Sequence, residues 1–307
     1  MTRSPYLGAA ALAALLALAA GAPVAGQKSR PRAAAQPRLL AMLKDNAVAE
    51  SSGLTVSRRD PKVLWTHNDS GGDPVLYATD RAGRALARFT VVGATAVDWE
   101  GIAAGPGPAG EPALFIGDIG DNGHARSSVV VYRVDEPPVD RAHTDHRGHT
   151  HLAQRFAFRY PDGPRDAETL LVHPASGEVF VISKEESGVS GAYRLPMPLA
   201  RDRTVTAERV ATIRFTNPLE FGGHAVGRLA TGGDFSRDGR HVAIRTYAEA
   251  FEWSLRPGQA LGEALRARPR TRGVPFLGQF EALTYDSDNR SLLTTAEGSP
   301  CPLWWAP

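Results

Sequence analysis

The chain has 307 residues, 42% of them hydrophobic and 22% charged, which places it among globular proteins and excludes a disordered chain. Its 35 basic and 33 acidic residues leave a net charge of +2, which excludes a strongly basic surface for binding nucleic acid. One cysteine, Cys301, excludes an internal disulfide framework and a thiolate metal cluster, so we expect a packed thiol there.

The N-terminus has the pattern of a secretory signal peptide over residues 1–26. Arg3 supplies a positive charge, an apolar run of Ala and Leu follows, and small residues precede Gln27. The run is short for a membrane span and no lipid-accepting cysteine follows it. We therefore expect a secreted or periplasmic protein with no stable membrane span after cleavage, and an uncleaved anchor is the alternative. Residues 27–37 are predicted to be a flexible linker and 38–307 a single domain.

After the linker, short apolar segments alternate with residues that favour turns. The chain has 31 Gly and 23 Pro, both of which are typical of turns. Each segment is rich in β-branched and aromatic residues, and no segment after Ala49 has a helical period of adequate length. The clearest predicted strands are Val63–Thr66, Val75–Ala78, Leu114–Gly117, Val129–Val134, Val179–Ser183, Val242–Thr246 and Leu292–Thr295. These patterns predict an all-β fold.

A short segment recurs five times, each time at the start of an apolar strand. The five copies are Glu50–Leu54, Asp98–Ile102, Asp166–Leu170, Thr231–Phe235 and Gln279–Leu283. A turn, a second strand and a third strand with an aromatic residue follow each copy, and the spacing of about 50 to 70 residues allows four strands per module. We predict a single β-propeller with five blades; a sixth blade would need a degenerate module within residues 207–229.

The two ends of the domain predict how the ring closes. The last module ends at Pro307 after three strands, and residues 38–43 precede the first module without a partner. Because a propeller cannot leave a sheet edge open, we expect the N-terminal segment to supply the missing outer strand. We expect the closed ring to be a monomer.

The inner strand of each blade lines the channel, so the starts of the five modules should converge at one end of it. The repeated position carries Ser52, Glu100, Glu168, Gly233 and Glu281, with Asp98 and Asp166 two residues before a glutamate. Carboxylates in a narrow channel repel one another unless they are protonated or neutralised by a cation, and oxygen ligands of this kind suit Ca²⁺ or Mg²⁺. The predicted metal ligands are Asp98, Glu100, Asp118, Glu168 and Glu281. The alternative is that these acids only cap strand ends and bind backbone N–H groups.

The ends of the second strands predict a second tier of side chains near the same end. Lys184 and Arg245 can pair with the acids, or can bind the phosphate or carboxylate of a small anionic ligand. The predicted ligand-binding residues are Asn68, Asp69, Lys184, Arg245 and Tyr247. The candidates for a catalytic role are His67, Glu100, Lys184 and Arg245.

The remaining motifs give weaker indications of a functional site. Four histidines fall within residues 143–151, where a solvated loop or adventitious Zn²⁺ or Ni²⁺ binding is expected. Residues 117–123 are rich in Gly and Asp and predict an acidic turn. No phosphate-binding Gly-rich loop or nucleophile elbow occurs, so no nucleotide or organic cofactor is indicated.

Several of these motifs resemble those of a group of bacterial exported β-propeller proteins. The motifs are Trp65–Gly71, Asp98–Ala103, Gly117–Asn122, Asp166–Glu168 and Arg245–Tyr247. The group is similar, more distantly, to the "esterase-like activity of phytase" and gluconolactonase-type propellers. The resemblance covers nearly the whole chain after the linker and implies a propeller, and the relatives of known chemistry use a calcium ion in the channel. No full catalytic motif of theirs matches this sequence residue by residue.

Two functions remain open at this point. The first is an exported propeller that holds a cation, expected to be calcium, and binds a small ligand or an envelope protein. The second is a metal-dependent hydrolase of phosphoesters, esters or lactones, with a carboxylate or His67 as the base. A third interpretation leaves the acids structural and places the binding surface on the rim.

Overall fold

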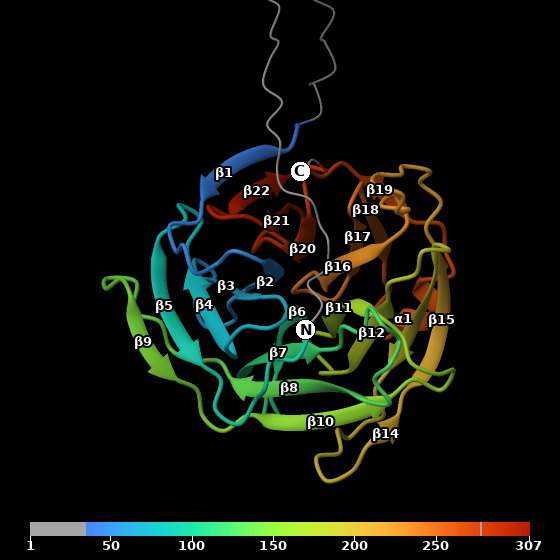
Figure 1. Cartoon of the computed structure of the whole chain (residues 1–307), viewed down its shortest axis with the longest axis horizontal. Helices are drawn as coiled ribbons and strands as arrows, with labels where there is room; N and C mark the ends of the chain where they lie inside the picture. The colour runs from blue at the N-terminus through green and yellow to red at the C-terminus, as the bar shows by residue number, and fades with distance from the viewer. Residues whose placement is uncertain (1–34, 277) are drawn as a thin grey trace, which may run out of the picture. The chain divides into compact units, whose positions relative to one another are not determined.

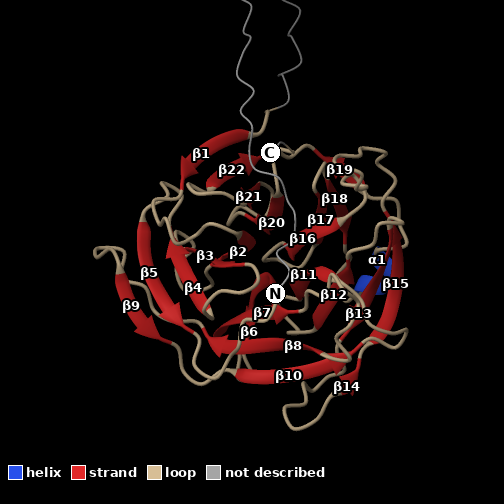
Figure 2. Ribbon diagram, in the orientation of Figure 1, coloured by secondary structure: helices blue, strands red, loops and turns tan. Residues whose placement is uncertain are grey.

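A computed structural model describes residues 35–276 and 278–307. Five β-sheets stand around a common axis, and each sheet runs outward from it (Figure 1). In the described residues the only α-helix is α1 (Leu261–Ala264), which contacts β15 (Glu208–Arg214) (Figure 2). The predicted all-β propeller with five blades is therefore confirmed. The predicted signal peptide and most of the predicted linker lie outside the described residues.

Each blade begins with an inner strand at the channel and ends with an outer strand at the rim. Blade 1 consists of β2 (Ser51–Val56), β3 (Leu64–Asn68), β4 (Val75–Thr79), β5 (Ala85–Thr90) and β9 (His146–His149). Blade 2 consists of β6 (Trp99–Pro106), β7 (Pro112–Asp118), β8 (Val129–Asp135), β10 (Gln154–Arg159) and β14 (Val205–Thr206). Blade 3 consists of β11 (Ala167–Val172), β12 (Val179–Ser183), β13 (Val189–Arg194) and β15. Blade 4 consists of β16 (Ala230–Phe235), β17 (His241–Thr246), β18 (Ala250–Ser254) and β19 (Arg270–Arg272). Blade 5 consists of β20 (Phe280–Tyr285), β21 (Leu292–Ala296), β22 (Pro302–Ala306) and β1 (Arg38–Met42).

The N-terminal strand closes the ring, as predicted. β1 pairs antiparallel with β22, so that Arg38 lies opposite Trp305, and the Arg38 guanidinium lies 5.1 Å from the centre of the Trp305 ring. The inner strand β2 contacts both β6 and β20, which joins the first blade to the second and to the last. Residues 207–229 form β15 and the loop before β16, and no sixth blade is found in the described residues.

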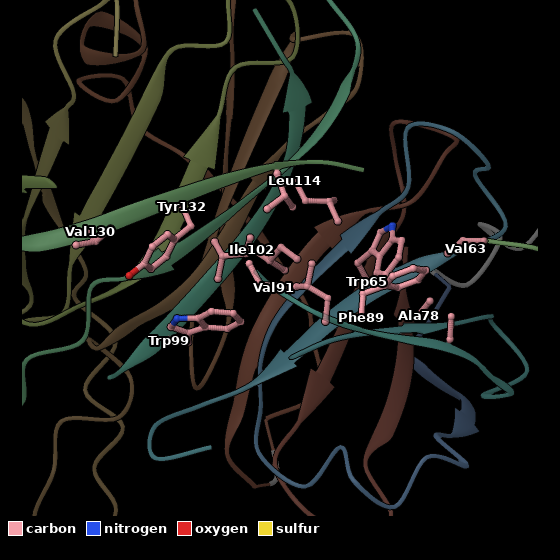
Figure 3. Close-up of a cluster of buried hydrophobic side chains, with 14 of the residues drawn as sticks. Val63, Trp65, Ala78, Phe89, Val91, Trp99, Ile102, Leu114, Val130 and Tyr132 are labelled. Atoms are coloured by element: carbon pink, nitrogen blue, oxygen red, sulfur yellow. The ribbon is translucent and has the colours of Figure 1, made fainter. Parts of the chain in front are cut away.

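Apolar side chains fill the space between neighbouring blades. Trp65 of blade 1 packs beside Phe89 at a ring distance of 5.8 Å, and the same cluster includes Trp99, Ile102 and Tyr132 of blade 2 (Figure 3). Burying a large apolar side chain stabilises a fold by about 1.5–3 kcal/mol. Similar clusters lie between the other pairs of adjacent blades, so the ring is held together by packing, without disulfides.

Two glycines let the inner strands approach closely. A Cβ on Gly232 would lie 2.2 Å from the backbone oxygen of Glu281, and a Cβ on Gly53 would lie 2.7 Å from the backbone nitrogen of Ile102. No side chain fits at these distances, since non-bonded carbon atoms rest about 3.5–4.0 Å apart. Glycine at these positions therefore keeps the channel narrow.

Two blades borrow an outermost strand from the next blade along the chain. β9 lies in the connection between β8 and β10, yet it pairs parallel with β5 of blade 1. β14 lies between β13 and β15, yet it pairs parallel with β10 of blade 2. Each strand thus braces two adjacent blades. The loop predicted over residues 143–151 is in part a strand, because it covers the open edge of β5.

Candidate metal and ligand site at one end of the channel

Each inner strand begins with a break in its pairing register. The shifts fall between Ser51 and Gly53, Trp99 and Ile102, Ala167 and Thr169, Ala230 and Gly232, and Phe280 and Ala282. An extra residue in a strand is left out of the ladder and its side chain is re-aimed. The displaced residues include Ser52, Glu100, Glu168, Thr231 and Glu281. The fourth member of the ring is therefore Thr231 and not Gly233, which the alignment of motifs placed there.

The three glutamates of this ring are buried, with 3%, 3% and 4% of the surface of Glu100, Glu168 and Glu281 exposed. The Ser52 hydroxyl donates to Glu100, the Lys184 ammonium donates to Glu168, and the Tyr247 hydroxyl donates to Glu281 Oε1 at 3.0 Å. In the described residues Oε2 of Glu168 and Oε2 of Glu281 have no hydrogen-bond partner. Burial raises the pKa of both glutamates, because a buried carboxylate oxygen without a partner is costly unless the group is protonated or neutralised by a cation.

A second tier of side chains follows from the same strand pairing. In each blade the first residue of the inner strand pairs with a residue of the second strand, and the tier consists of the residue that comes directly after that partner in the sequence. Asp69, Lys184, Tyr247 and Glu297 hold this position in blades 1, 3, 4 and 5, and Ile119 holds it in blade 2. Four of the five blades therefore place an ionisable side chain next to the ring. The second strands do converge on the first tier as expected, although Arg245 and Asn68 do not belong to this position.

Three carboxylates come close enough to share a metal ion. One carboxylate oxygen from each of Asp69, Asp98 and Glu100 lies within 4.8 Å of the others. Calcium binds oxygens at about 2.3–2.6 Å, so two of its ligands are separated by at most about 5 Å. The residues present thus fit a calcium ion. Asp69, which the sequence placed among ligand-binding residues, joins Asp98 and Glu100 as a metal-ligand candidate.

The pKa values of several carboxyl groups in this cluster are raised, because the groups are buried and several negative charges lie close together. Burial, and then the charges of Asp69 and Asp166, raise the pKa of Asp98 to about 7. Burial, and then the charges of Asp69 and Glu50, raise the pKa of Glu297 to about 7. Burial and neighbouring carboxylates also raise the pKa of Glu100. Without a cation, the cluster therefore takes up protons near neutral pH.

Lys184 is the one base that forms an ion pair with a ring glutamate in the described residues. Burial opposes its charge, but Glu168, Asp166 and Glu281 outweigh that effect and raise its pKa. Its ammonium also lies 5.8 Å from the centre of the Tyr247 ring. Lys184 and Tyr247, both predicted as ligand-binding residues, are thus brought together beside the carboxylates.

Asp118 is not one of the three carboxylates whose oxygens lie within 4.8 Å of one another. Its carboxylate pairs with Arg126 at 2.8 Å and accepts a hydrogen bond from the backbone N–H of Asp98 at 3.2 Å. Burial raises its pKa although Arg126 opposes the shift. This predicted metal ligand positions the segment that carries Asp98, directly before β6.

Arg245 is fully buried and its guanidinium is occupied by the protein itself. It donates to the backbone oxygens of Thr246 at 3.1 Å and Pro275 at 3.3 Å, and also to the Thr294 hydroxyl. It lies 5.4 Å from the centre of the Phe280 ring, and burial lowers its pKa to about 9. Arg245 therefore connects blade 4 to blade 5 and acts as a positioning residue.

His67 and Asn68 also make internal contacts. The fully buried His67 ring faces Trp99 at 5.6 Å and donates from Nδ1 to the Asn68 carbonyl at 2.9 Å. Burial lowers the pKa of His67, which favours the neutral ring. The Asn68 amide accepts from Ala49 N at 3.1 Å and donates to Ala47 O at 2.7 Å, so it holds the preceding loop.

The four histidines of residues 143–151 do not gather into a metal site. His143 pairs with Asp140 and His151 with Asp135, both at exposed positions. In the part of the chain that the structure describes, the only group of three metal-ligating side chains is the one at the channel. Cys301 is buried and its thiol contacts the Ala296 carbonyl, as expected for a packed thiol.

Comparisons with protein-family models and with curated proteins find no match. Among solved structures, a gluconolactonase from Xanthomonas campestris is 15% identical over 90% of this chain and 96% of its own, with a TM-score of 0.45. A β-propeller domain from Myceliophteria thermophila is 12% identical over 84% of this chain and 83% of its own, with a TM-score of 0.40. A likeness at this level carries nothing about the residues of the channel. Among the described residues, no helix has the length and apolar character that a membrane crossing requires.

Proposed function

We propose that this protein is an exported β-propeller that binds a calcium ion at the acidic end of its channel and, beside it, a small anionic ligand. The observation that carries the proposal is the pair of buried, unpartnered oxygens on Glu168 and Glu281 next to the three carboxylates that share a 4.8 Å space. A divalent cation held by Asp69, Asp98 and Glu100 would offset the repulsion between Glu100 and the charges of Glu168 and Glu281.

The ligand site is inferred from the coordination positions that the three carboxylates would leave unfilled on the cation. Asp69, Asp98 and Glu100 supply three carboxylates, whereas calcium takes six to eight oxygen ligands. An oxyanion of the ligand would complete the coordination shell. Lys184, whose side chain is 15% exposed, stands beside Tyr247 at the same end and can donate to that ligand. An envelope protein presenting an acidic side chain would use the same contacts.

The test is calcium binding by the purified protein. Calorimetric titration after chelation should detect one calcium per chain, and Glu100→Gln should weaken binding at least tenfold. Glu263→Gln is a matched control, because Glu263 is exposed on α1. Absence of calcium binding, or equal affinities for both variants and the parent protein, would refute the proposal.

A metal-dependent hydrolase of phosphoesters, esters or lactones is the second candidate, favoured by the ammonium of Lys184 next to the carboxylates. A bound calcium would polarise a substrate oxygen. His67 is fully buried, so the base of such an enzyme would be a carboxylate of the cluster. Turnover of p-nitrophenyl phosphate, ester and lactone substrates with calcium, abolished by EDTA and by Glu100→Gln, would establish it.

Export is proposed from the signal-like sequence of residues 1–26. N-terminal sequencing of the protein recovered from the periplasm or the medium should begin at Gln27. Recovery of the full-length chain from the membrane fraction would favour the uncleaved anchor.

A further inference from the structure

The opposite end of the channel also holds a pocket. The ends of all five inner strands line it, through Val56, Ala104, Val172, Phe235 and Tyr285. The pocket encloses about 20 Å³, which is room for about one water molecule. It lies at the end of the inner strands away from Glu100 and Glu168, so it is separate from the proposed cation site.

Two arginines, Arg58 of blade 1 and Arg237 of blade 4, line this pocket. Both are partly buried, and neither forms an ion pair with a carboxylate in the described residues. Arg58 donates to the Pro174 carbonyl at 3.2 Å, and Arg237 donates to the Arg58 carbonyl at 3.5 Å. Burial, and then the charge of Arg237, lower the pKa of Arg58. Two like charges thus face one small space.

The carboxylate that lines the pocket, Asp234, forms no ion pair with either arginine in the described residues, although its charge acts on both. Its Oδ2 accepts hydrogen bonds from the Thr284 hydroxyl at 2.6 Å and the Tyr285 N–H at 3.1 Å. These bonds hold Asp234 against blade 5. Glu136, whose charge also acts on Arg58, accepts hydrogen bonds from the Trp65 indole N–H at 2.9 Å and the Arg58 backbone N–H at 3.1 Å.

We propose that this pocket binds one carboxylate or phosphate group between Arg58 and Arg237. Guanidinium groups bind the oxygens of such groups in a bidentate manner, and a pocket of water size admits a single oxygen while the rest of the group remains at the mouth. A bound oxyanion would relieve the repulsion between the two arginines. The site would take an inorganic anion or the acidic end of a larger molecule.

The experiment measures binding of sodium phosphate and of sodium acetate by calorimetry, against sodium chloride at equal ionic strength. EDTA is present throughout, so that a cation at the other end cannot recruit the anion. We expect phosphate, acetate or both to bind, with the stronger of them identifying the class of group. Arg237→Gln should weaken that binding at least tenfold, and Arg237→Lys, which keeps the charge, should weaken it less.

Arg240→Gln is the matched control, because Arg240 is exposed in the same turn and does not line the pocket. Its affinity should stay within twofold of the parent protein. Circular dichroism establishes that each variant is folded. The proposal is wrong if neither phosphate nor acetate binds more tightly than chloride, or if Arg237→Gln and Arg240→Gln weaken binding equally.

Discussion

The ammonium of Lys184 donates to Oε1 of Glu168, while Oε2 of the same carboxylate is buried and has no hydrogen-bond partner among the residues that the structure describes. The pair therefore neutralises one ring glutamate but leaves half of its hydrogen-bonding capacity free. Glu168 is thus compensated in charge and can still accept one further hydrogen bond.

Lys184→Gln should destabilise the metal-free protein. Breaking a buried ion pair leaves an unpaired charge and costs about 3–5 kcal/mol, so we expect a loss of about 3 kcal/mol in denaturant unfolding at pH 8 with EDTA. Calcium should recover much of this loss by neutralising Glu168. Lys62→Gln, at an exposed position, should change stability by less than about 0.5 kcal/mol. Equal stability of the two variants would contradict the role of the pair.

Glu281→Gln should change stability in opposite directions with and without calcium. Removing one of several repelling carboxylates should raise the melting temperature in EDTA, since the Tyr247 hydroxyl can still donate to the amide oxygen. In saturating calcium the same variant should melt below the parent protein, because a negative charge beside Glu100 that attracts the cation is lost. Differential scanning calorimetry in both buffers checks the reversal. A decrease of similar size in both conditions would show that Glu281 acts only in packing.

The metal-free protein should lose stability as pH rises from about 4 to about 7. Asp98 and Glu297 have folded-state pKa values of about 7, whereas carboxyl groups in an unfolded chain titrate near about 4. Between these values the folded state binds more protons than the unfolded state, so the free energy of unfolding falls as pH increases. Melting temperatures measured in EDTA across this range should decline. Saturating calcium should reduce the slope, and a rising curve in EDTA would refute the prediction.

Gly232→Ala should destabilise the fold by more than about 2 kcal/mol. Its Cβ would lie 2.2 Å from the backbone oxygen of Glu281, and a backbone group cannot move aside without shifting an inner strand. Gly273→Ala is the control, because a Cβ there meets nothing within 4 Å. Denaturant unfolding of both variants should separate them clearly. If they unfold together, the close approach of β16 and β20 is not required.

Deletion of residues 1–42 should open the ring. The deletion removes β1 and leaves the backbone groups of β22 unpaired, and exposed strand edges promote aggregation. A deletion of residues 1–34 keeps β1 and serves as the control. Size-exclusion chromatography should show a monomer for the shorter deletion and aggregates for the longer one.

Much of this fold was predictable from the sequence because the module repeats. Each copy carries the same local signal, so the five inner strands and the closing strand are all placed correctly. The braces β9 and β14 were not predictable, because each pairs with a blade other than the one that flanks it in the chain. Local patterns contain no information about such a transfer.

The site was predictable in its composition and less so in its grouping. Glu100, Glu168 and Glu281 share a motif position. The shift in strand register at that position sets the direction in which the side chain points. Asp118 pairs with Arg126 from the following turn, a contact that spacing along a strand does not predict. Glu297 was predictable, because it follows its strand as Asp69 follows β3.

The braces have a consequence for how the molecule opens. Blade 1 cannot detach without releasing β9, nor blade 2 without releasing β14, so blades 1 to 3 should unfold as one cooperative unit. Blade 5 takes its outer strand β1 from the segment that precedes blade 1, so among the described residues only blade 4 neither lends nor receives a strand. Amide hydrogen exchange should therefore be fastest in β19 and the strands beside it. Blade 4 should therefore be the part of the ring with the lowest free energy of local unfolding.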